Sequence, residues 1–253
     1  MLIEIPRTIR RLKQEFIEEL YLRFEGEDIW LNMRLQYGEK DEYYEEKTVN
    51  TIGIWMSGGA DSSMLTYLLA KKIKDEKLNI KIQPLSVRRG RPNNPIYAGN
   101  VVDFIENDLD IKMNEHIIYY PDILDEHQRE IKEFWDRDDE NFREGVFQIL
   151  YSGITCNPPV DDKTIPLNKE RSRDADADRP LKSVNGIRYY LNPFFDIHKK
   201  QLAELYKEND LLDTLFPITY SCEGEAEVTK THTQHCEKCW WCQERFWAFG
   251  RYI

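Results

Sequence analysis

The chain has no long apolar stretch. Its 253 residues contain no uninterrupted apolar run of about eighteen, the length that a membrane-spanning helix needs. Residues 1–7 lack the basic start, apolar run and small-residue exit of a signal peptide. Together, these absences predict a cytoplasmic protein with no membrane partner.

Basic residues are also in deficit. The chain has 35 Lys and Arg against 46 Asp and Glu, a net charge of −11. Because phosphate backbones select basic surfaces, a large nucleic-acid interface is not expected, although an acidic chain can still carry a local basic channel. The hydrophobic content of 41% is enough for the packed core of one α/β domain with additions, or of two small domains.

Cysteine is almost absent from the first 221 residues, where it occurs once. The other four, which crowd the C-terminus, are Cys222, Cys236, Cys239 and Cys242. In a reducing compartment, such clustering indicates a metal site rather than disulfides. Four thiolates satisfy one tetrahedral zinc ion and leave no open position, which predicts a structural zinc site. An iron–sulfur cluster is the rival interpretation, and His232 or His235 could replace one sulfur.

The most informative stretch is Ser-Gly-Gly-Ala-Asp-Ser-Ser at residues 57–63. An apolar segment that is typical of a buried strand precedes it, and a segment of helical character follows. Two glycines let the backbone approach an anion, and a helix N-terminus offers unpaired N–H groups. Asp61 cannot donate to a phosphate, so a metal-binding or helix-capping role suits it better. A capped helix after a tight turn is the alternative, but it would need only one of these polar residues.

Strand and helix signals alternate through the middle of the chain. This pattern predicts an α/β fold, a parallel sheet with helices on both faces and with ligands at the carboxyl ends of its strands. Pro84 weakens the second strand unless it lies at an end or a bulge, and Asp196 is the expected N-cap of the last helix. The expected strands are 50–56, 80–87, 116–120, 150–156 and 188–195. The expected helices are 8–24, 101–105, 123–135, 141–149 and 196–206.

Three regions follow from these patterns. Residues 1–49 are expected to form a helical extension, 50–220 the α/β domain, and 221–253 the metal-binding segment. Residues 157–186 contain four prolines and a charged run, which indicates a solvated loop or a lid that closes over ligands.

The 57–63 motif resembles the pyrophosphate loop of the N-type ATP pyrophosphatases. This resemblance implies an ATP-binding domain in which ATP is cleaved between its α and β phosphates and the substrate is adenylated. The motif is not a Walker A loop, because no Gly-Lys-Ser or Gly-Lys-Thr follows it.

Within that superfamily, two further blocks resemble 7-cyano-7-deazaguanine synthase. They are residues 192–199 and residues 219–249, which include Cys-x-x-Cys-x-x-Cys, Arg245 and the pair Ala248 and Phe249. The resemblance implies an adenine-nucleotide α-hydrolase-like parallel sheet with a C-terminal zinc knuckle. It also implies an ATP-dependent carbon–nitrogen ligase of queuosine biosynthesis, which uses ATP, Mg²⁺ and Zn²⁺ to convert 7-carboxy-7-deazaguanine and ammonia to the 7-cyano product. A homodimer is expected from the resemblance alone.

The resemblance also implies roles for single residues. Asp61 would position magnesium, and Lys199 or one of Arg88 and Arg89 would neutralise charge that grows on the phosphates. Lys199 as an ordinary surface charge is the alternative. The residues that would hold the pyrophosphate are Ser57, Gly58, Gly59, Ser62 and Ser63, with Asp61 beside them.

Two segments depart from the family pattern, and they keep other functions open. Residues 86–91 and 152–159 replace sequences that the family carries after its second and fourth strands. The departures favour a related enzyme that adenylates another carboxylate, such as a modified base or a protein terminus, in a phage or defence context. A tRNA thiolase with Cys156 as its catalytic thiol is a further alternative, although a lone cysteine is more often a core residue. A non-catalytic zinc scaffold is disfavoured by the intact motif.

Overall fold

The structure of the protein is a computed structural model. It describes residues 49–88, 94–120, 137–159, 161–165, 183–184, 187–188, 190–194, 197–225 and 227–253. The helical extension at 1–49, with its expected helix at 8–24, lies outside these residues except for Val49. The expected helix at 123–135, Asp196, and most of the segment 157–186 also lie outside them.

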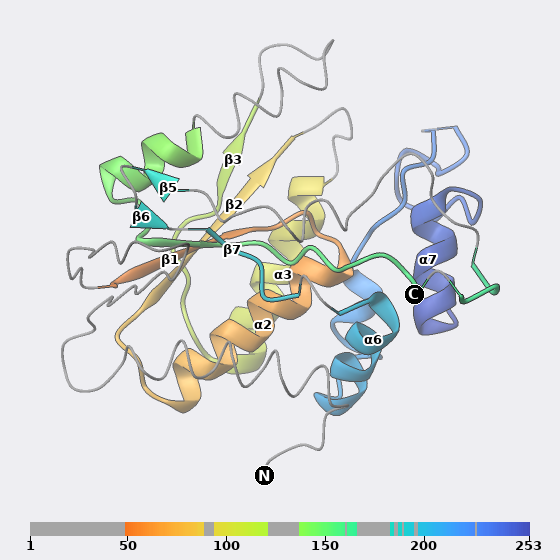
Figure 1. Cartoon of the computed structure of the whole chain (residues 1–253), viewed down its shortest axis with the longest axis horizontal. Helices are drawn as coiled ribbons and strands as arrows, with labels where there is room; N and C mark the ends of the chain where they lie inside the picture. The colour runs from red at the N-terminus through yellow and green to blue at the C-terminus, as the bar shows by residue number, and fades with distance from the viewer. Residues whose placement is uncertain are drawn as a thin grey trace, which may run out of the picture.

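A five-stranded parallel sheet with the order β3-β2-β1-β4-β7 organises the described chain (Figure 1). Its strands are β1 (Thr51–Trp55), β2 (Lys81–Val87), β3 (Ile117–Tyr119), β4 (Ile149–Tyr151) and β7 (Tyr190–Leu191). The first strand lies in the centre, and the chain moves outward first to one edge and then to the other. In doubly wound sheets, ligands bind outside the carboxyl end of the strand at which the direction of winding reverses, which in this order is β1.

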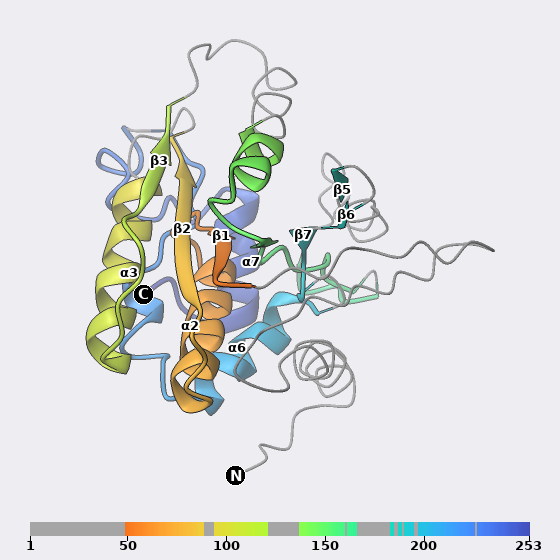
Figure 2. The ribbon, with the colours of Figure 1, turned by 90° about the vertical axis from the view of Figure 1, so that its left-hand side faces the viewer.

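Helices cover both faces of the sheet. The side chains of β1 alternate: Ile52 and Ile54 pack with α2 (Ala60–Asp75) and α3 (Asn94–Leu109) in the main core. Trp55 faces the opposite way, toward a smaller cluster that includes Phe142 from the helical residues 137–144. Figure 2 shows α3 and this second helix on opposite sides of β2. This arrangement confirms the predicted α/β class, a parallel sheet with helices on both faces.

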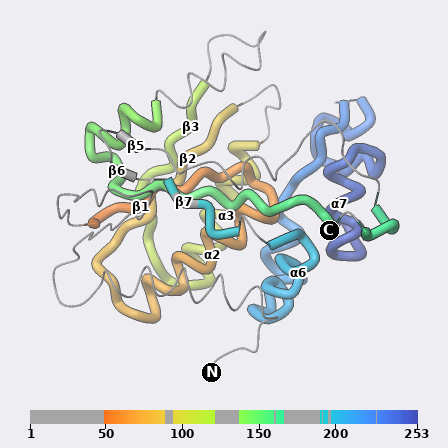
Figure 3. Tube along the Cα trace, in the orientation of Figure 1, coloured from red at the N-terminus to blue at the C-terminus, as the bar shows by residue number. Residues whose placement is uncertain are grey.

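The C-terminal part packs against one end of this core. It comprises α6 (Lys199–Glu208), the short 3-10 helix η1 (Phe216–Ile218) and α7 (Trp240–Phe249), and α6 and α7 lie side by side (Figure 3). Tyr206, Phe216 and Phe249 join the three helices, with ring centroids 4.1 to 5.7 Å apart. A two-stranded antiparallel ribbon, β5 (Ser183–Val184) and β6 (Ile187–Arg188), completes the described elements.

The helix expected at 141–149 is wrong in its second half. Residues 137–144 are helical, the chain turns at Gly145 with a φ of 77°, and Ile149 already belongs to β4. There Ile149 lies opposite Ile52 of β1. A buried apolar run does not distinguish a strand from a helix by its periodicity, and pairing with the central strand decides the outcome.

Other element bounds also differ from expectation. The strand expected at 150–156 ends at Tyr151, and the one expected at 188–195 is divided between β6 and β7. The helix expected at 101–105 extends over the whole of α3. The described N-cap of α6 is His198, whose N–H donates to Gln201 Oε1 at 3.0 Å.

Pro84 lies within β2, opposite Ile54 of β1. Its neighbour Leu85 turns its backbone toward β1, where its carbonyl accepts from Met56 N at 2.7 Å. Pro84 therefore turns its backbone toward β3, whose pairing begins only at Leu85. The N–H that Pro84 lacks would point toward β3 before the pairing of β2 with β3 begins. The proline therefore removes no hydrogen bond between β2 and β1, which explains how a paired strand tolerates it.

Among the described residues, no helix combines the length and apolarity that crossing a membrane would require.

Two glycines provide a matched test of the packing. A Cβ added at Gly53 would lie 2.8 Å from Phe147 Cδ1 and 3.0 Å from Leu150 Cδ1, whereas one added at Gly99 in α3 would meet no atom within 4 Å. We expect Gly53→Ala to lower the free energy of unfolding by roughly 1–3 kcal/mol through overpacking. Gly99→Ala should raise it by roughly 0.5–1 kcal/mol, because alanine favours a helix. Urea denaturation followed by circular dichroism measures both, and equal stability of the two variants would contradict the packing described.

Candidate functional site

Residues 57–63, named here the serine–glycine loop, connect β1 to α2. Gly58 adopts a φ of 74°, which favours glycine, and an added Cβ there would lie 2.5 Å from the Cβ of Tyr97. Gly59 is the N-cap of α2, with an extended backbone and no side chain to cap the helix. The loop therefore needs glycine at position 58 both for its backbone angle and for its close contact with α3.

The loop serines bind the loop's own backbone. Ser63 Oγ donates to Gly59 O at 2.7 Å, and Ser62 Oγ donates to the same carbonyl at 3.3 Å. The N–H groups of Ser57 and Gly59 donate to serine hydroxyls at 3.3 and 3.2 Å, which is long for such bonds. The first N–H groups of α2 have no acceptor within the helix. An anion could therefore take the free amides and displace the two long contacts.

Asp61 and Lys199 meet at the N-terminus of α2. Lys199 Nζ donates to Asp61 Oδ1 at 2.8 Å and to Oδ2 at 2.6 Å, across 138 residues of sequence. The Lys199 side chain is only 6% exposed, and that of Asp61 is 22% exposed. The structure thus brings together two of the three residues predicted to be catalytic, and it excludes the reading of Lys199 as an ordinary surface charge. A divalent cation at Asp61 would have to displace this ammonium.

A second carboxylate, which the sequence interpretation missed, also lies close to Lys199. Glu244 of α7 is fully buried, and its Oε2 is 3.6 Å from Lys199 Nζ. The sequence feature that could have indicated Glu244 is that it is the one acidic residue in the aromatic-rich α7, two positions after Cys242.

The next residue, Arg245, is also buried. Its guanidinium donates to Thr219 Oγ1 at 2.9 Å, to Phe216 O at 3.0 Å and to Tyr252 O at 2.7 Å. Burial lowers the pKa of Arg245 to about 10, so it remains charged at neutral pH. Arg245 thereby ties α7 to η1 and to the C-terminal residues.

Arg88, the third predicted catalytic residue, is exposed and follows the end of β2. The guanidinium of Arg88 lies 5.7 Å from the centroid of the Tyr120 ring, and its backbone N–H donates to the backbone carbonyl of Tyr119 at 2.9 Å. The structure places Arg88 at the strand end that was predicted, in contact with Tyr120 and not with the Asp61–Lys199 pair. Arg89 lies outside the described residues.

Residues 152–156, which follow β4, pack against the first turn of α2 next to the serine–glycine loop. A Cβ added at Gly153 would lie 2.9 Å from Asp61 O and from Ser62 N, so this backbone touches the first turn of α2. Ser152 and Thr155 are buried in the same segment. Cys156 is partly buried, and its N–H donates to Ile197 O at 2.9 Å. The segment is therefore well placed to contact a molecule bound at the loop.

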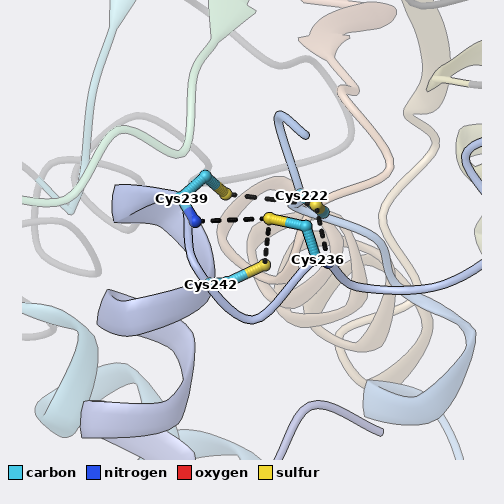
Figure 4. A group of neighbouring side chains, drawn as sticks. All are labelled: Cys222, Cys236, Cys239 and Cys242. Atoms are coloured by element: carbon cyan, nitrogen blue, oxygen red, sulfur yellow. Dashed lines mark hydrogen bonds between the residues drawn. The ribbon is translucent and has the colours of Figure 1, made fainter. Parts of the chain in front are cut away.

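The four C-terminal cysteines converge, as Figure 4 shows. All four sulfur atoms lie within 4.8 Å of one another, with 3.9 Å between the sulfurs of Cys236 and Cys242 and 4.0 Å between those of Cys239 and Cys222. A tetrahedral ion with metal–sulfur bonds of about 2.3 Å has sulfur–sulfur edges of about 3.8 Å. The thiols therefore fit a single metal ion, and this cysteine cluster (Cys222, Cys236, Cys239 and Cys242) is a candidate metal site.

Backbone amides support the cysteine cluster. Gly224 N and Cys236 N donate to the sulfur of Cys222, and Cys239 N donates to that of Cys236, all at 3.2 Å. A hydrogen bond from Cys242 lowers the pKa of the Cys239 thiol to about 5. This shift favours the thiolate, the form that binds a metal.

Neither nearby histidine belongs to the group of potential ligands found among the described residues, which consists of the four cysteines. The ring of His235 lies 4.9 Å from that of Tyr220 and 5.7 Å from that of Tyr252, measured between centroids. His232 Nδ1 is 3.4 Å from Thr229 Oγ1. In this structure, both imidazoles contact residues around the cysteine cluster.

The cysteine cluster adjoins the serine–glycine loop. Tyr220, two residues before Cys222, donates its N–H to Gly58 O at 2.8 Å and stacks on Tyr97 with centroids 4.7 Å apart. A Cβ added at Gly59 would lie 3.3 Å from Ser221 Oγ. The chain thus passes directly from the loop contact into the metal site.

Comparisons with known proteins leave the family open. No family model matches the sequence, and no curated protein is significantly similar to it. Among solved structures, the U34-tRNA thiolase NcsA from Methanococcus maripaludis with its 4Fe–4S cluster has a TM-score of 0.44 and 12% identity, over 83% of this chain and 73% of that one. A predicted subunit of a tRNA methyltransferase from Methanocaldococcus jannaschii has a TM-score of 0.31 and 18% identity, over 62% of this chain and 74% of that one. Both TM-scores are below 0.5, so neither likeness identifies a family or an activity for this chain.

The cysteine cluster predicts a simple stoichiometry. We expect one metal ion per chain, and Cys242→Ser should lose most of it because the variant removes a buried ligand. Cys156→Ser is the matched control, since Cys156 lies outside the cluster, and it should keep the ion. Elemental analysis of the purified proteins measures both. Equal metal content in the two variants would contradict the assignment.

Proposed function

We propose that this chain is an ATP-dependent enzyme of the N-type ATP pyrophosphatase superfamily that adenylates a carboxylate and transfers the acyl group to ammonia. The observation that carries the proposal is the Asp61–Lys199 pair at the N-terminus of α2, in a loop that also holds two glycines and three serines. Backbone N–H groups, hydroxyls, a cation and a carboxylate lie together at the carboxyl end of the central strand, although the hydroxyls of Ser62 and Ser63 donate to Gly59 O and would have to turn to meet a ligand. Such a combination suits a polyphosphate with a divalent cation.

The proposed reaction assigns a task to each part of the site. An oxygen of the substrate carboxylate attacks the α-phosphorus of ATP, and the bond to the β-phosphate oxygen breaks to release pyrophosphate. The serine–glycine loop would hold this leaving group, Lys199 would offset its negative charge, and Asp61 would hold Mg²⁺. Ammonia then attacks the acyl carbon through its lone pair, loses a proton, and displaces AMP to leave an amide.

We propose 7-carboxy-7-deazaguanine as the first substrate to test, with the amide dehydrated to the 7-cyano product in a second ATP-dependent step. The resemblance of residues 192–199 and 219–249 to 7-cyano-7-deazaguanine synthase supports this choice. The segment that contacts α2 through Gly153 departs from that family, which favours another carboxylate as the second candidate. A tRNA thiolase is the third candidate, for which Cys156 would supply the thiol.

We propose zinc as the ion in the cysteine cluster. Sulfur separations of 3.9 and 4.0 Å suit four thiolates around one ion. In a 4Fe–4S cluster each thiolate binds a different iron, so the sulfurs lie further apart. Zinc bound by four thiolates has no open position, which gives the ion a structural role beside the serine–glycine loop.

A product assay tests the activity. The protein is incubated with ATP, Mg²⁺, ammonium and 7-carboxy-7-deazaguanine, and AMP and the base products are followed by mass spectrometry. AMP with the amide or nitrile supports the first candidate, and AMP formed only with another carboxylate supports the second. Sulfur incorporation into tRNA supports the thiolase. Absence of AMP with every substrate would overturn the proposal.

Two lysines of α6 provide a matched pair of variants. Lys199→Met should lower AMP formation by about 100-fold, because the cation that offsets the leaving charge is lost. Lys200→Met should leave it nearly unchanged, since Lys200 is exposed and pairs with Asp162 at 2.9 Å. Initial rates at saturating ATP measure both. Similar rates for the two variants would remove Lys199 from the site.

A further inference from the structure

Glu244 has no task in the chemistry above, although its position is costly. Its side chain is fully buried, and a buried carboxylate is unfavourable unless a cation compensates for the lost hydration. Lys199 provides that compensation, with its Nζ 3.6 Å from Glu244 Oε2. The ion pair with Lys199 connects Glu244 to the serine–glycine loop.

The two carboxylates around Lys199 differ in access. Asp61 is 22% exposed and lies in the first turn of α2, whereas Glu244 is 0% exposed and belongs to α7. A divalent cation that arrives with a phosphate can reach Asp61 and compete with Lys199 for it. Glu244 cannot be reached in this way, so it keeps its contact with the ammonium when Asp61 changes partner.

The position of Glu244 is fixed from both sides. Cys239 is the N-cap of α7 and Cys242 lies in its first turn, so a metal in the cysteine cluster would hold the start of the helix. Arg245 then anchors the helix through carbonyls of η1 and of the C-terminal residues. Glu244 lies between these two attachments, which leaves its carboxylate little freedom to move.

We propose that Glu244 is a positioning residue, which holds the Lys199 ammonium at the serine–glycine loop when a divalent cation takes Asp61. This inference rests on the proposed function, because it requires that a phosphate and a divalent cation bind at the loop. It also connects the cysteine cluster to the loop through α7, Glu244 and Lys199. Without Glu244, Lys199 would have to follow Asp61 or remain buried without a counter-ion.

Calorimetric titration of the full-length protein with pyrophosphate in the presence of Mg²⁺ tests this role. We expect Glu244→Gln to weaken binding by about tenfold, because Lys199 is no longer held in place. A purely electrostatic role has the opposite sign, since removal of a negative charge would strengthen the binding of an anion. Glu204→Gln is the control: this exposed residue of α6 pairs with Lys207, and its variant should bind as the parent protein does.

A double-mutant cycle tests whether Glu244 acts through Lys199. In a Lys199→Met background, Glu244→Gln should weaken pyrophosphate binding no further. An additive loss, or a Glu244→Gln protein that binds as tightly as the parent, would overturn the inference and leave the proposed function intact. Failure of the parent protein itself to bind pyrophosphate would overturn the proposed function, and the inference with it.

A second substitution separates positioning from stability. Glu244→Asp keeps the charge with a shorter side chain and should recover part of the affinity that Glu244→Gln loses. Metal content and thermal unfolding of both variants show whether each is folded. Failure of a folded, metal-loaded Glu244→Asp protein to bind better than Glu244→Gln would contradict the proposal.

Discussion

The contact between Lys199 and Asp61 is the interaction on which the site depends. A 6% exposed ammonium is stable only beside a counter-charge, and Asp61 at the start of α2 provides it. The contact joins α6 to the helix that follows the central strand, and Glu244 connects α7 to the same ammonium. Three helices from distant parts of the chain thus meet at the carboxyl end of β1, where a doubly wound sheet binds its ligands.

The cysteine cluster and the serine–glycine loop form one continuous unit. The backbone N–H of Tyr220 donates to the carbonyl of Gly58 in the loop, and Cys222 of the cluster follows two residues later. The segment between η1 and α7 has few buried apolar residues other than those around the cysteines, so metal binding would supply much of its folding free energy. We expect the ion to act on the loop through packing, because its four protein ligands leave no position for a substrate.

Sequence patterns predicted the elements that depend on neighbouring residues. The strand–turn–helix around the loop and the grouping of the cysteines were both correct, because each is carried by a short motif. The helix at 141–149 was wrong in its second half, since pairing of Ile149 with Ile52 overrides local preference. Glu244 was missed because a single carboxylate in an aromatic helix forms no sequence motif. Nothing local links it to Lys199, its partner 45 residues earlier in the chain.

What the sequence by itself determined is the chemistry available: a turn of two glycines, three serines and an aspartate at a strand end, four thiols at metal-ligand spacing, and an α/β alternation. The tertiary structure alone decided how these parts meet. It placed Lys199 within ion-pair distance of both Asp61 and Glu244, set Arg88 against Tyr120, and joined Tyr220 to Gly58. The physical reason is that hydrogen bonds and ion pairs act over a few ångströms, whereas residues 138 positions apart come that close only after the sheet and its helices have packed.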